Sequence, residues 1–227
     1  MDTAGPVAGV ALTDAGDLLA DLAWQTRAGH AAELLPAIDG LLARAGVGRM
    51  DLRAVFVCRG PGGYAGLRVG LSAAMALAFA LGIDLLSVGR LEADAYPHTG
   101  CGRRIVAVHA AGRGDLAWAV YRPDGGWYEE MAPRLTDPAG LFAAAPRGAL
   151  VCGEVDGDLA AQLGRARPDL AVVTGPAFAR RAVTIAALAW PRYLAGARDR
   201  PDAVEPIYLR APHITPSRAD RQRDGLP

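Results

Sequence analysis

Hydrophobic positions in the first part of the chain follow two spacings, one typical of strands and one typical of a helix. Residues 7–12 and 18–24 are short apolar runs joined by Asp-Ala-Gly at 14–16, which predicts a β-hairpin with a glycine turn. Between residues 31 and 45, large aliphatic side chains recur at helical spacing, at Leu34, Leu35, Ile38, Leu41 and Leu42. This spacing predicts an amphipathic helix, and Gly46 is the expected stop.

The next hydrophobic segments alternate between strand and helix. We predict a strand at 54–58, a helix from about 67 to 81 that Gly82 caps, and a strand at 85–88. A hairpin followed by helix, strand, helix and strand predicts a mixed sheet with helices packed on it. The expected fold class is therefore α/β.

A second set of strands follows a boundary at residues 97–102, which contain one proline and two glycines. The predicted strands and the final helix are 105–109, 116–121, 127–131, 149–152 and 184–195. Residues 123–126, Pro-Asp-Gly-Gly, are typical of a turn. We therefore expect an N-terminal lobe at 1–98, a C-terminal lobe at 103–210 and a tail at 211–227.

The predicted helix at 67–81 has no evident polar face. Within residues 71–81 the only polar side chain is Ser72, and a helix that is apolar all round is usually buried all round. Two explanations stay open: the helix lies inside the core, or it forms a partner-binding surface with the helix at 31–45. The apolar run at 69–83 is shorter than the ~20 residues that span a bilayer.

Composition restricts the chemistry of the chain. The 227 residues are 52% hydrophobic, which is enough for a real core, and 24 basic residues balance 24 acidic ones. Lysine is absent, so a Schiff base and a Walker lysine are excluded. A neutral chain is not expected to bind nucleic acid alone, because phosphate binding needs a concentrated basic face. Arginines in the tail alternate with acids, as in a solvated segment.

Residue types that serve as nucleophiles or metal ligands are scattered. Cys58, Cys101 and Cys152 form no C-x-x-C pair, so neither a disulfide framework nor a zinc knuckle is indicated, and a reducing cytoplasm fits them. The histidines show neither H-x-x-x-H nor H-E-x-x-H, and no serine lies in G-x-S-x-G. We therefore predict no metal site and no catalytic residue.

Residues 59–68, Arg-Gly-Pro-Gly-Gly-Tyr-Ala-Gly-Leu-Arg, are the most informative segment. Glycines let a backbone turn sharply, and a helix that begins behind them points unpaired N–H groups forward. Both a phosphate cradle and a tight structural corner stay open. If the loop faces phosphate, the residues that face it are Asp2, Thr3, Gly60, Gly62 and Gly63. The alternative for Asp2 and Thr3 is that they belong to a disordered terminus.

Five segments together resemble the TsaB family, also called YeaZ. They are Asp-Thr-Ala at 2–4, His-Ala-Ala-Glu-Leu-Leu-Pro at 30–36, the glycine segment at 59–71, Gly-Arg-Gly-Asp at 112–115 and Glu-Pro-Ile-Tyr-Leu-Arg at 205–210. They occur in order along nearly the whole chain, and the glycine segment is the most specific. The resemblance implies an actin and sugar-kinase-like (ASKHA) α/β fold, with two ribonuclease-H-like lobes and mixed sheets.

The resemblance also implies a function. Members of the family act in making N6-threonylcarbamoyladenosine beside the anticodon of tRNA, as the non-catalytic partner of the transferase TsaD, and a small ATPase, TsaE, joins them. Whether the chain also forms a homodimer stays open. The resemblance implies that tRNA is bound only by the assembled complex. It implies no cofactor beyond ATP or ADP held within that complex.

In the family, the first two helices of the N-terminal lobe form the partner surface. The corresponding residues here are Leu34, Leu35, Ile38, Leu41, Leu67, Leu71, Ala74, Met75 and Ala78. Charged residues at Leu34 and Ile38 are expected to abolish association and to leave the monomer folded.

The chain departs from the family pattern at three places. Most relatives carry several apolar residues before Asp2, so either the true start lies upstream or the first strand is shortened. Gly63 and Ala65 stand where relatives often carry hydroxyl residues, and Ala110 stands where an acid is usual. The competing hypothesis is an ATP-binding ATPase or phosphotransferase of the same fold, which requires an acid for magnesium and a hydroxyl-rich phosphate loop.

Overall fold

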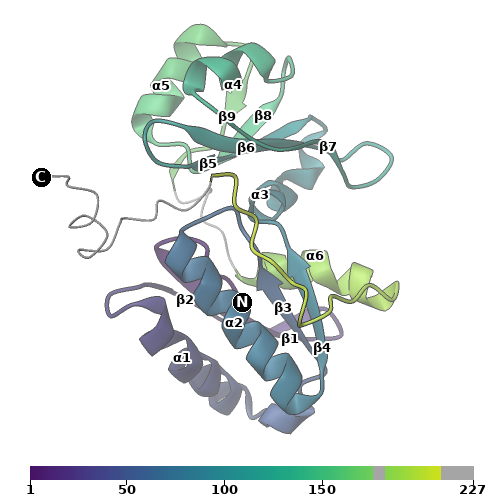
Figure 1. The fold of residues 1–227 in the computed structure, drawn as a ribbon. Coiled ribbons are helices and arrows are strands. Elements are labelled where there is room, and N and C mark those ends of the chain that lie inside the picture. Colours follow the sequence, from purple (N-terminus) through teal and green to yellow (C-terminus); the bar gives the residue numbers. More distant parts are fainter. Residues whose placement is uncertain (176–181, 211–227) are drawn as a thin grey trace, which may run out of the picture.

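A computed structural model describes residues 1–175 and 182–210, and it divides them into two lobes (Figure 1). The lower lobe in Figure 1 contains β1 (Val7–Asp14), β2 (Asp17–Gln25), α1 (His30–Ala45), β3 (Ala54–Cys58), α2 (Tyr64–Leu81), β4 (Asp84–Val88) and α6 (Ala182–Leu194). The upper lobe contains β5 (Ile105–Ala110), β6 (Leu116–Arg122), β7 (Tyr128–Thr136), α4 (Pro138–Ala144), β8 (Leu150–Gly153), α5 (Gly157–Ala166) and β9 (Ala171–Val172). Helix α3 (Arg90–Ala95) lies between them, and short 3-10 turns occur at Arg49–Asp51 and Tyr96–Cys101.

The α/β class with mixed sheets is confirmed. Two element boundaries differ from the predictions by three residues or more, and one helix packs in another lobe than expected. Helix α2 begins at Tyr64, before the expected residue 67, and strand β7 runs on to Thr136, past the expected residue 131. Helix α6 falls in the expected second lobe, 103–210, yet it packs against β1 and β4 of the first lobe. The chain therefore returns to the first lobe after completing the second.

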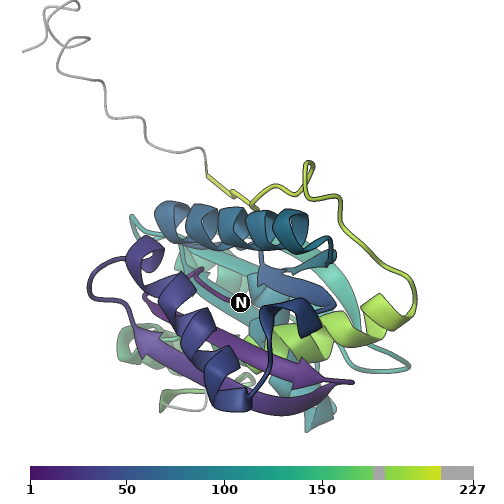
Figure 2. The ribbon, with the colours of Figure 1, turned by 90° about the horizontal axis from the view of Figure 1, so that it is seen from below.

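Strand β3 is buried on both faces, because helices cover both sides of the strands in the first lobe (Figures 1 and 2). Val55 and Val57 pack with residues of α2. Phe56 and Cys58 point the other way, where the ring of Phe56 meets the ring of Tyr193 on α6. This alternation follows from the two-residue period of a strand and explains why the whole run 54–58 is apolar.

Residues 1 and 2 lie between the two pairs of strands in this lobe. The backbones of Asp2 and Gly9 exchange two hydrogen bonds, with N···O distances of 2.9 and 2.8 Å. On the other side, the N–H of Cys58 donates to the carbonyl of Met1 at 2.9 Å, and the Met1 amine donates to the carbonyl of Phe56 at 2.7 Å. The segment is antiparallel to β1, and its bonding pattern with β3 is that of parallel strands.

The second lobe has a five-stranded sheet in the order β7-β6-β5-β8-β9. Strand β5 pairs antiparallel with β6 and parallel with β8. One face, with Val106, Val108 and Trp118, packs under α4 and α5, and the other face packs on α3. The sheet and α3 together bring the ends of β5 and β8 toward the first lobe.

Helix α2 packs closely on the N-terminal residues because Gly66 and Gly70 lie inside it. A Cβ at Gly66 would stand 2.2 Å from the carbonyl oxygen of Thr3, and one at Gly70 would stand 2.2 Å from the Thr3 hydroxyl. Among the described helices, α2 is the one that reaches the length and apolar character of a membrane span, a test that buried core helices also pass. Here its inner side packs on Val55 and Val57.

Candidate functional site

The glycine loop that follows β3 is a tight corner packed against the protein's own N-terminal segment. The N–H of Gly63 donates to the carbonyl of Ala4 at 3.0 Å, and the carbonyl of Gly60 accepts from the N–H of Arg90 at 2.7 Å. A Cβ at Gly62 would lie 2.2 Å from the Ala4 oxygen, and Gly60 has a φ of 98°. Gly60 and Gly62 are thus needed for the corner itself, because a larger residue at either position would be strained or would clash.

Asp2 and Thr3, the predicted acid and hydroxyl of a phosphate site, are buried and use their polar groups internally. The Asp2 carboxylate accepts a hydrogen bond from the N–H of Ala4 at 3.0 Å. The Thr3 hydroxyl donates to the carbonyl of Gly66 at 2.7 Å. Thr3 therefore ties the N-terminal segment to α2, and Asp2 fixes a turn within that segment.

A cleft of about 710 Å³ separates the two lobes beside this corner. Of the five residues predicted to face phosphate, Thr3, Gly62 and Gly63 line the cleft, whereas Asp2 and Gly60 are not among its lining residues. His109 and Glu154 line it from the second lobe. The phosphate-facing role of the loop stays a prediction.

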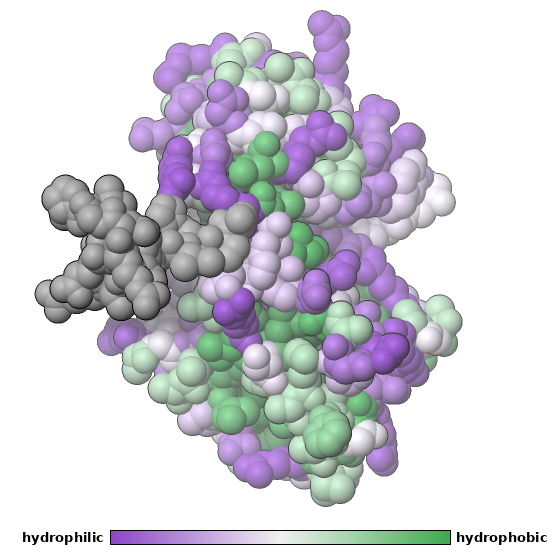
Figure 3. Space-filling view, viewed as in Figure 1, coloured by the Kyte–Doolittle hydropathy of each residue, from purple (hydrophilic) through white to green (hydrophobic). Residues whose placement is uncertain are grey.

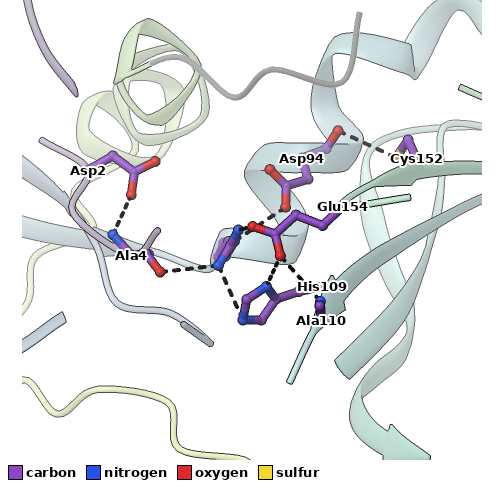
Figure 4. Close-up of polar contacts among 8 residues, drawn as sticks. Asp2, Ala4, Asp94, His109, Ala110, Cys152 and Glu154 are labelled. Atoms are coloured by element: carbon purple, nitrogen blue, oxygen red, sulfur yellow. Dashed lines mark hydrogen bonds and ion pairs between the residues drawn. The ribbon is translucent and has the colours of Figure 1, made fainter. Parts of the chain in front are cut away.

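At the back of this cleft, three charged or titratable side chains that the sequence analysis missed form one cluster (Figure 4). The Arg90 side chain, which is 2% exposed, pairs with Glu154 and approaches Nε2 of His109 at 3.3 Å. Nδ1 of His109 lies 2.6 Å from the other carboxylate oxygen of Glu154. Nδ1 then donates to the carboxylate, and Nε2 accepts from the guanidinium.

The environment of Glu154 keeps it ionised. Partial burial raises the pKa of Glu154, but the hydrogen bond from His109 and the positive charge of Arg90 lower it more, so that the pKa lies at about 2. Arg90 also donates to the carbonyl of Ala4 at 3.1 Å, which ties the cluster to the first lobe. The cluster therefore joins the two lobes.

The residues of the predicted partner surface on α1 and α2 differ in burial: some are buried in this chain and others are exposed. Six of its nine residues lie at 7% exposure or less and belong to the core of this chain: Leu34, Leu41, Leu67, Leu71, Ala74 and Ala78. Leu35 is 51% exposed, and Ile38 and Met75 are partly exposed. Leu34 and Ile38 were predicted to tolerate charge without loss of folding; for Leu34, at 1% exposure, the structure contradicts this, because a buried charge destabilises the core.

The outer side of α2 carries an exposed apolar surface centred on Phe79, a residue that the sequence analysis did not name. Phe79 is 87% exposed, and Ser72, Ala76 and Ala80 are exposed with it on the outer side of α2. Figure 3 shows apolar atoms over the lower lobe where α1 and α2 face the viewer. The inner side of this helix is thus part of the core and its outer side is exposed, and the binding of a partner to the exposed side stays a prediction. Phe79 could have been found as the one aromatic residue between Ala74 and Leu81.

Within residues 1–175 and 182–210, no three His, Cys, Asp or Glu side chains come together as metal ligands. The Cys152 thiol is buried, and burial raises its pKa.

Comparisons with known proteins agree with this architecture. Residues 25–151 match the family model described as "TsaD: tRNA N6-adenosine threonylcarbamoyltransferase". The tRNA threonylcarbamoyladenosine biosynthesis protein TsaB of Bacillus subtilis is 29% identical over 133 residues, which are 59% of this chain and 58% of that protein. The chain thus matches less than two thirds of the length of this curated relative.

Two further similarities extend over nearly the whole chain. The uncharacterized protein Rv3421c of Mycobacterium tuberculosis is 30% identical over 226 residues, which are 95% of this chain and 92% of that protein. The structure of YeaZ from Pseudomonas aeruginosa superposes with a TM-score of 0.78 at 24% identity, covering 92% of this chain and 97% of that one. The second similarity shows the shared fold.

Proposed function

We propose that this chain, which belongs to the TsaD family of tRNA N6-adenosine threonylcarbamoyltransferases, is a non-catalytic partner subunit in the synthesis of N6-threonylcarbamoyladenosine in tRNA. The name of the Bacillus subtilis relative, a tRNA threonylcarbamoyladenosine biosynthesis protein, supports this role. In the proposal, TsaD transfers the threonylcarbamoyl group, and this chain binds TsaD and supports its active form.

The exposed apolar surface of α1 and α2 is the observation that carries the proposal. A phenylalanine that is 87% exposed and a leucine that is 51% exposed lose contact with water when a partner covers them, and this burial favours association. Small residues on the same side of α2, including Ala76 and Ala80, let another helix approach closely. We therefore propose TsaD as the occupant of this surface, with Leu35, Ile38, Met75 and Phe79 as its main contacts.

The other members of the assembly follow from the same proposal. TsaE joins the complex of this chain with TsaD, and tRNA binds to the complex as a whole, because the chain carries 24 basic and 24 acidic residues. ATP or ADP is held, if at all, within that assembly. We expect the complex to act in the cytoplasm.

The competing function, an ATP-binding phosphotransferase, requires free polar groups at the phosphate loop. Here the N–H of Gly63 and the hydroxyl of Thr3 donate to Ala4 and Gly66, and the Asp2 carboxylate accepts from Ala4. Groups that are engaged inside the protein would first have to break these bonds to hold a nucleotide. The subunit role is therefore the better supported of the two.

The test is association with purified TsaD from the same organism. We expect the unaltered chain to bind TsaD, and we expect Phe79→Glu to weaken binding at least about tenfold, because a charge would be buried at the interface. The matched control is Leu194→Glu, at a side chain that is 67% exposed at the end of α6, away from α2. It should bind TsaD as the unaltered chain does.

Isothermal titration calorimetry and light scattering separate the outcomes. Equal binding by Phe79→Glu and the unaltered chain would reject the proposed surface. The chain alone could have the mass of a dimer, and Phe79→Glu could convert that dimer to monomers. In that case TsaD must compete with dimer formation, and failure of TsaD to compete would also reject the proposal. Threonylcarbamoyl transfer to tRNA by the purified chain without TsaD would reject the non-catalytic role.

A further inference from the structure

Two segments that the sequence analysis singled out, 112–115 and 205–210, meet at the boundary between the lobes. The Arg210 guanidinium pairs with the Asp115 carboxylate, and the two residues are 95 positions apart in the chain. In Figure 1 the later segment, drawn in yellow, rises from the lower lobe and reaches the upper lobe. Residues 206–210, which we call the strap, thus link the lobes at a place separate from α3.

The first end of the strap is fixed to the glycine corner and to α2. The N–H of Ile207 donates to the carbonyl of Arg59 at 2.8 Å. The ring of Tyr208 stacks on the ring of Tyr64 with 4.9 Å between their centroids, and the Tyr208 hydroxyl accepts from Nε of Arg68 at 3.2 Å. All of these contacts are with residues of the first lobe.

The second end of the strap is fixed to the turn between β5 and β6. Besides its ion pair with Asp115, the Arg210 guanidinium donates to the carbonyls of Ala111 and Gly112 at 3.5 and 3.4 Å. Within the turn, the N–H of Ala111 donates to the carbonyl of Asp115 at 2.9 Å, and the N–H of Asp115 donates to that of Gly112 at 3.1 Å. One side chain of the strap therefore contacts three residues of a single turn in the second lobe.

The strap forms part of the wall of the cleft between the lobes. Residues 207–210 line this cleft together with His109 and Glu154. The Arg90 side chain at the back of the cleft is 2% exposed, whereas the side chains of Arg210 and Asp115 are 32% and 33% exposed. Ion pairs in contact with water are weak, and a buried charge is costly to leave without its partner. Of the two links between the lobes, the strap is therefore the easier one to release.

We propose that the strap is a latch that holds the two lobes closed over the cleft between them. When Arg210 leaves Asp115, the lobes open about α3, where Arg90 keeps its contacts, and the cleft becomes wider. The strap suits this role because its two ends rest on different lobes. The proposal concerns the chain alone and does not depend on TsaD. A latch needs both of its ends, which distinguishes it from two independent local contacts.

The first test compares amide hydrogen exchange in two variants that each release one end of the strap. Tyr208→Ala removes the stacking in the first lobe, and we expect exchange of the Ala111 and Asp115 amides in the second lobe to become at least about fivefold faster. Asp115→Ala removes the ion pair in the second lobe, and exchange of the Ile207 amide should rise to a similar extent. Faster exchange only at the altered end would overturn the proposal.

Matched control variants remove similar groups away from the strap. Tyr128→Ala removes a ring that is 44% exposed and lies 5.6 Å from the Arg122 guanidinium, and Asp124→Ala removes the acid that pairs with Arg122. Neither control should change exchange of the Ile207 or Ala111 amides. Equal changes in the controls and in the strap variants would overturn the proposal.

The second test measures opening directly, as the radius of gyration from small-angle X-ray scattering. Tyr208→Ala and Asp115→Ala should each give a larger radius than the unaltered chain. The double variant should give no larger a radius than either single variant, because one released end already frees the lobes. An unchanged radius in the single variants would overturn the proposal, as would two single effects that add in the double variant.

Circular dichroism checks that the variants are folded. Should Tyr208→Ala fail to fold, Asp115→Ala, at a side chain 33% exposed, provides both measurements by itself. Asp115→Ala with unchanged Ile207 exchange and an unchanged radius would then overturn the proposal.

Discussion

Arg90 is paired with Glu154 across the boundary between the two lobes. Arg90 begins α3, Glu154 follows β8, and the two are 64 residues apart in the chain. The same guanidinium donates to the carbonyl of Ala4 in the first lobe at 3.1 Å. One buried side chain therefore contacts both lobes.

Replacing Arg90 by methionine should destabilise the protein by about 3–5 kcal/mol. The substitution leaves the Glu154 carboxylate and the Ala4 carbonyl without their buried donor. Urea unfolding measures the change. The matched control is Arg104→Met, which breaks a pair with Glu130 at side chains 42% and 31% exposed and should cost at most about 1 kcal/mol. Equal losses in the two variants would contradict the role of Arg90.

The stability of the protein should fall in acid because of Glu154. Its pKa is about 2 in the folded protein against an ordinary value of 4.5, so the folded state favours the ionised form. The stabilisation is complete above about pH 4.5 and is lost as the pH falls toward 2. Glu154→Gln should remove this contribution to the slope of the free energy of unfolding against pH. Urea midpoints measured between pH 2 and 6 would show it, and an unchanged slope would contradict it.

Gly66→Ala should destabilise the protein although alanine normally favours a helix. The added Cβ would stand 2.2 Å from the Thr3 carbonyl oxygen, so α2 must move away from residues 3 and 4. We expect a loss of at least about 2 kcal/mol. Gly40→Ala in α1 is the control, because its Cβ has no neighbour within 4 Å, and it should stabilise by up to about 1 kcal/mol. Stabilisation by both variants in thermal unfolding would show that the close approach is not needed.

Leu34 and Leu35 are neighbours in α1 with opposite expected roles. Leu34 is 1% exposed, so Leu34→Ala should cost about 2–5 kcal/mol in urea unfolding. Leu35 is 51% exposed, so Leu35→Ala should change stability by at most about 0.5 kcal/mol and should weaken binding to TsaD. An unchanged affinity of Leu35→Ala for TsaD would remove this residue from the proposed surface.

The glycine segment shows how far local pattern alone can go. Its glycines predicted a corner between a strand and a helix, and the corner is present between β3 and α2. The pattern left open whether the corner faces a ligand or the protein, because glycine permits close approach by either. The contacts of Gly62 and Gly66 with Ala4 and Thr3 come from residues about 60 positions earlier, and no window of local sequence contains them.

Hydrophobic spacing alone determined the hairpin, α1, β3, β4 and the α/β class, because the periods of helices and strands depend on residues only a few positions apart. Tertiary structure decided which side of α1 and α2 is exposed, that α6 joins the first lobe, and that Arg90, His109 and Glu154 meet. Those three residues lie 19 and 45 positions apart, and their contacts arise only when the two lobes are packed together. Burial and ion pairing depend on that packing, which is why the sequence could not predict them.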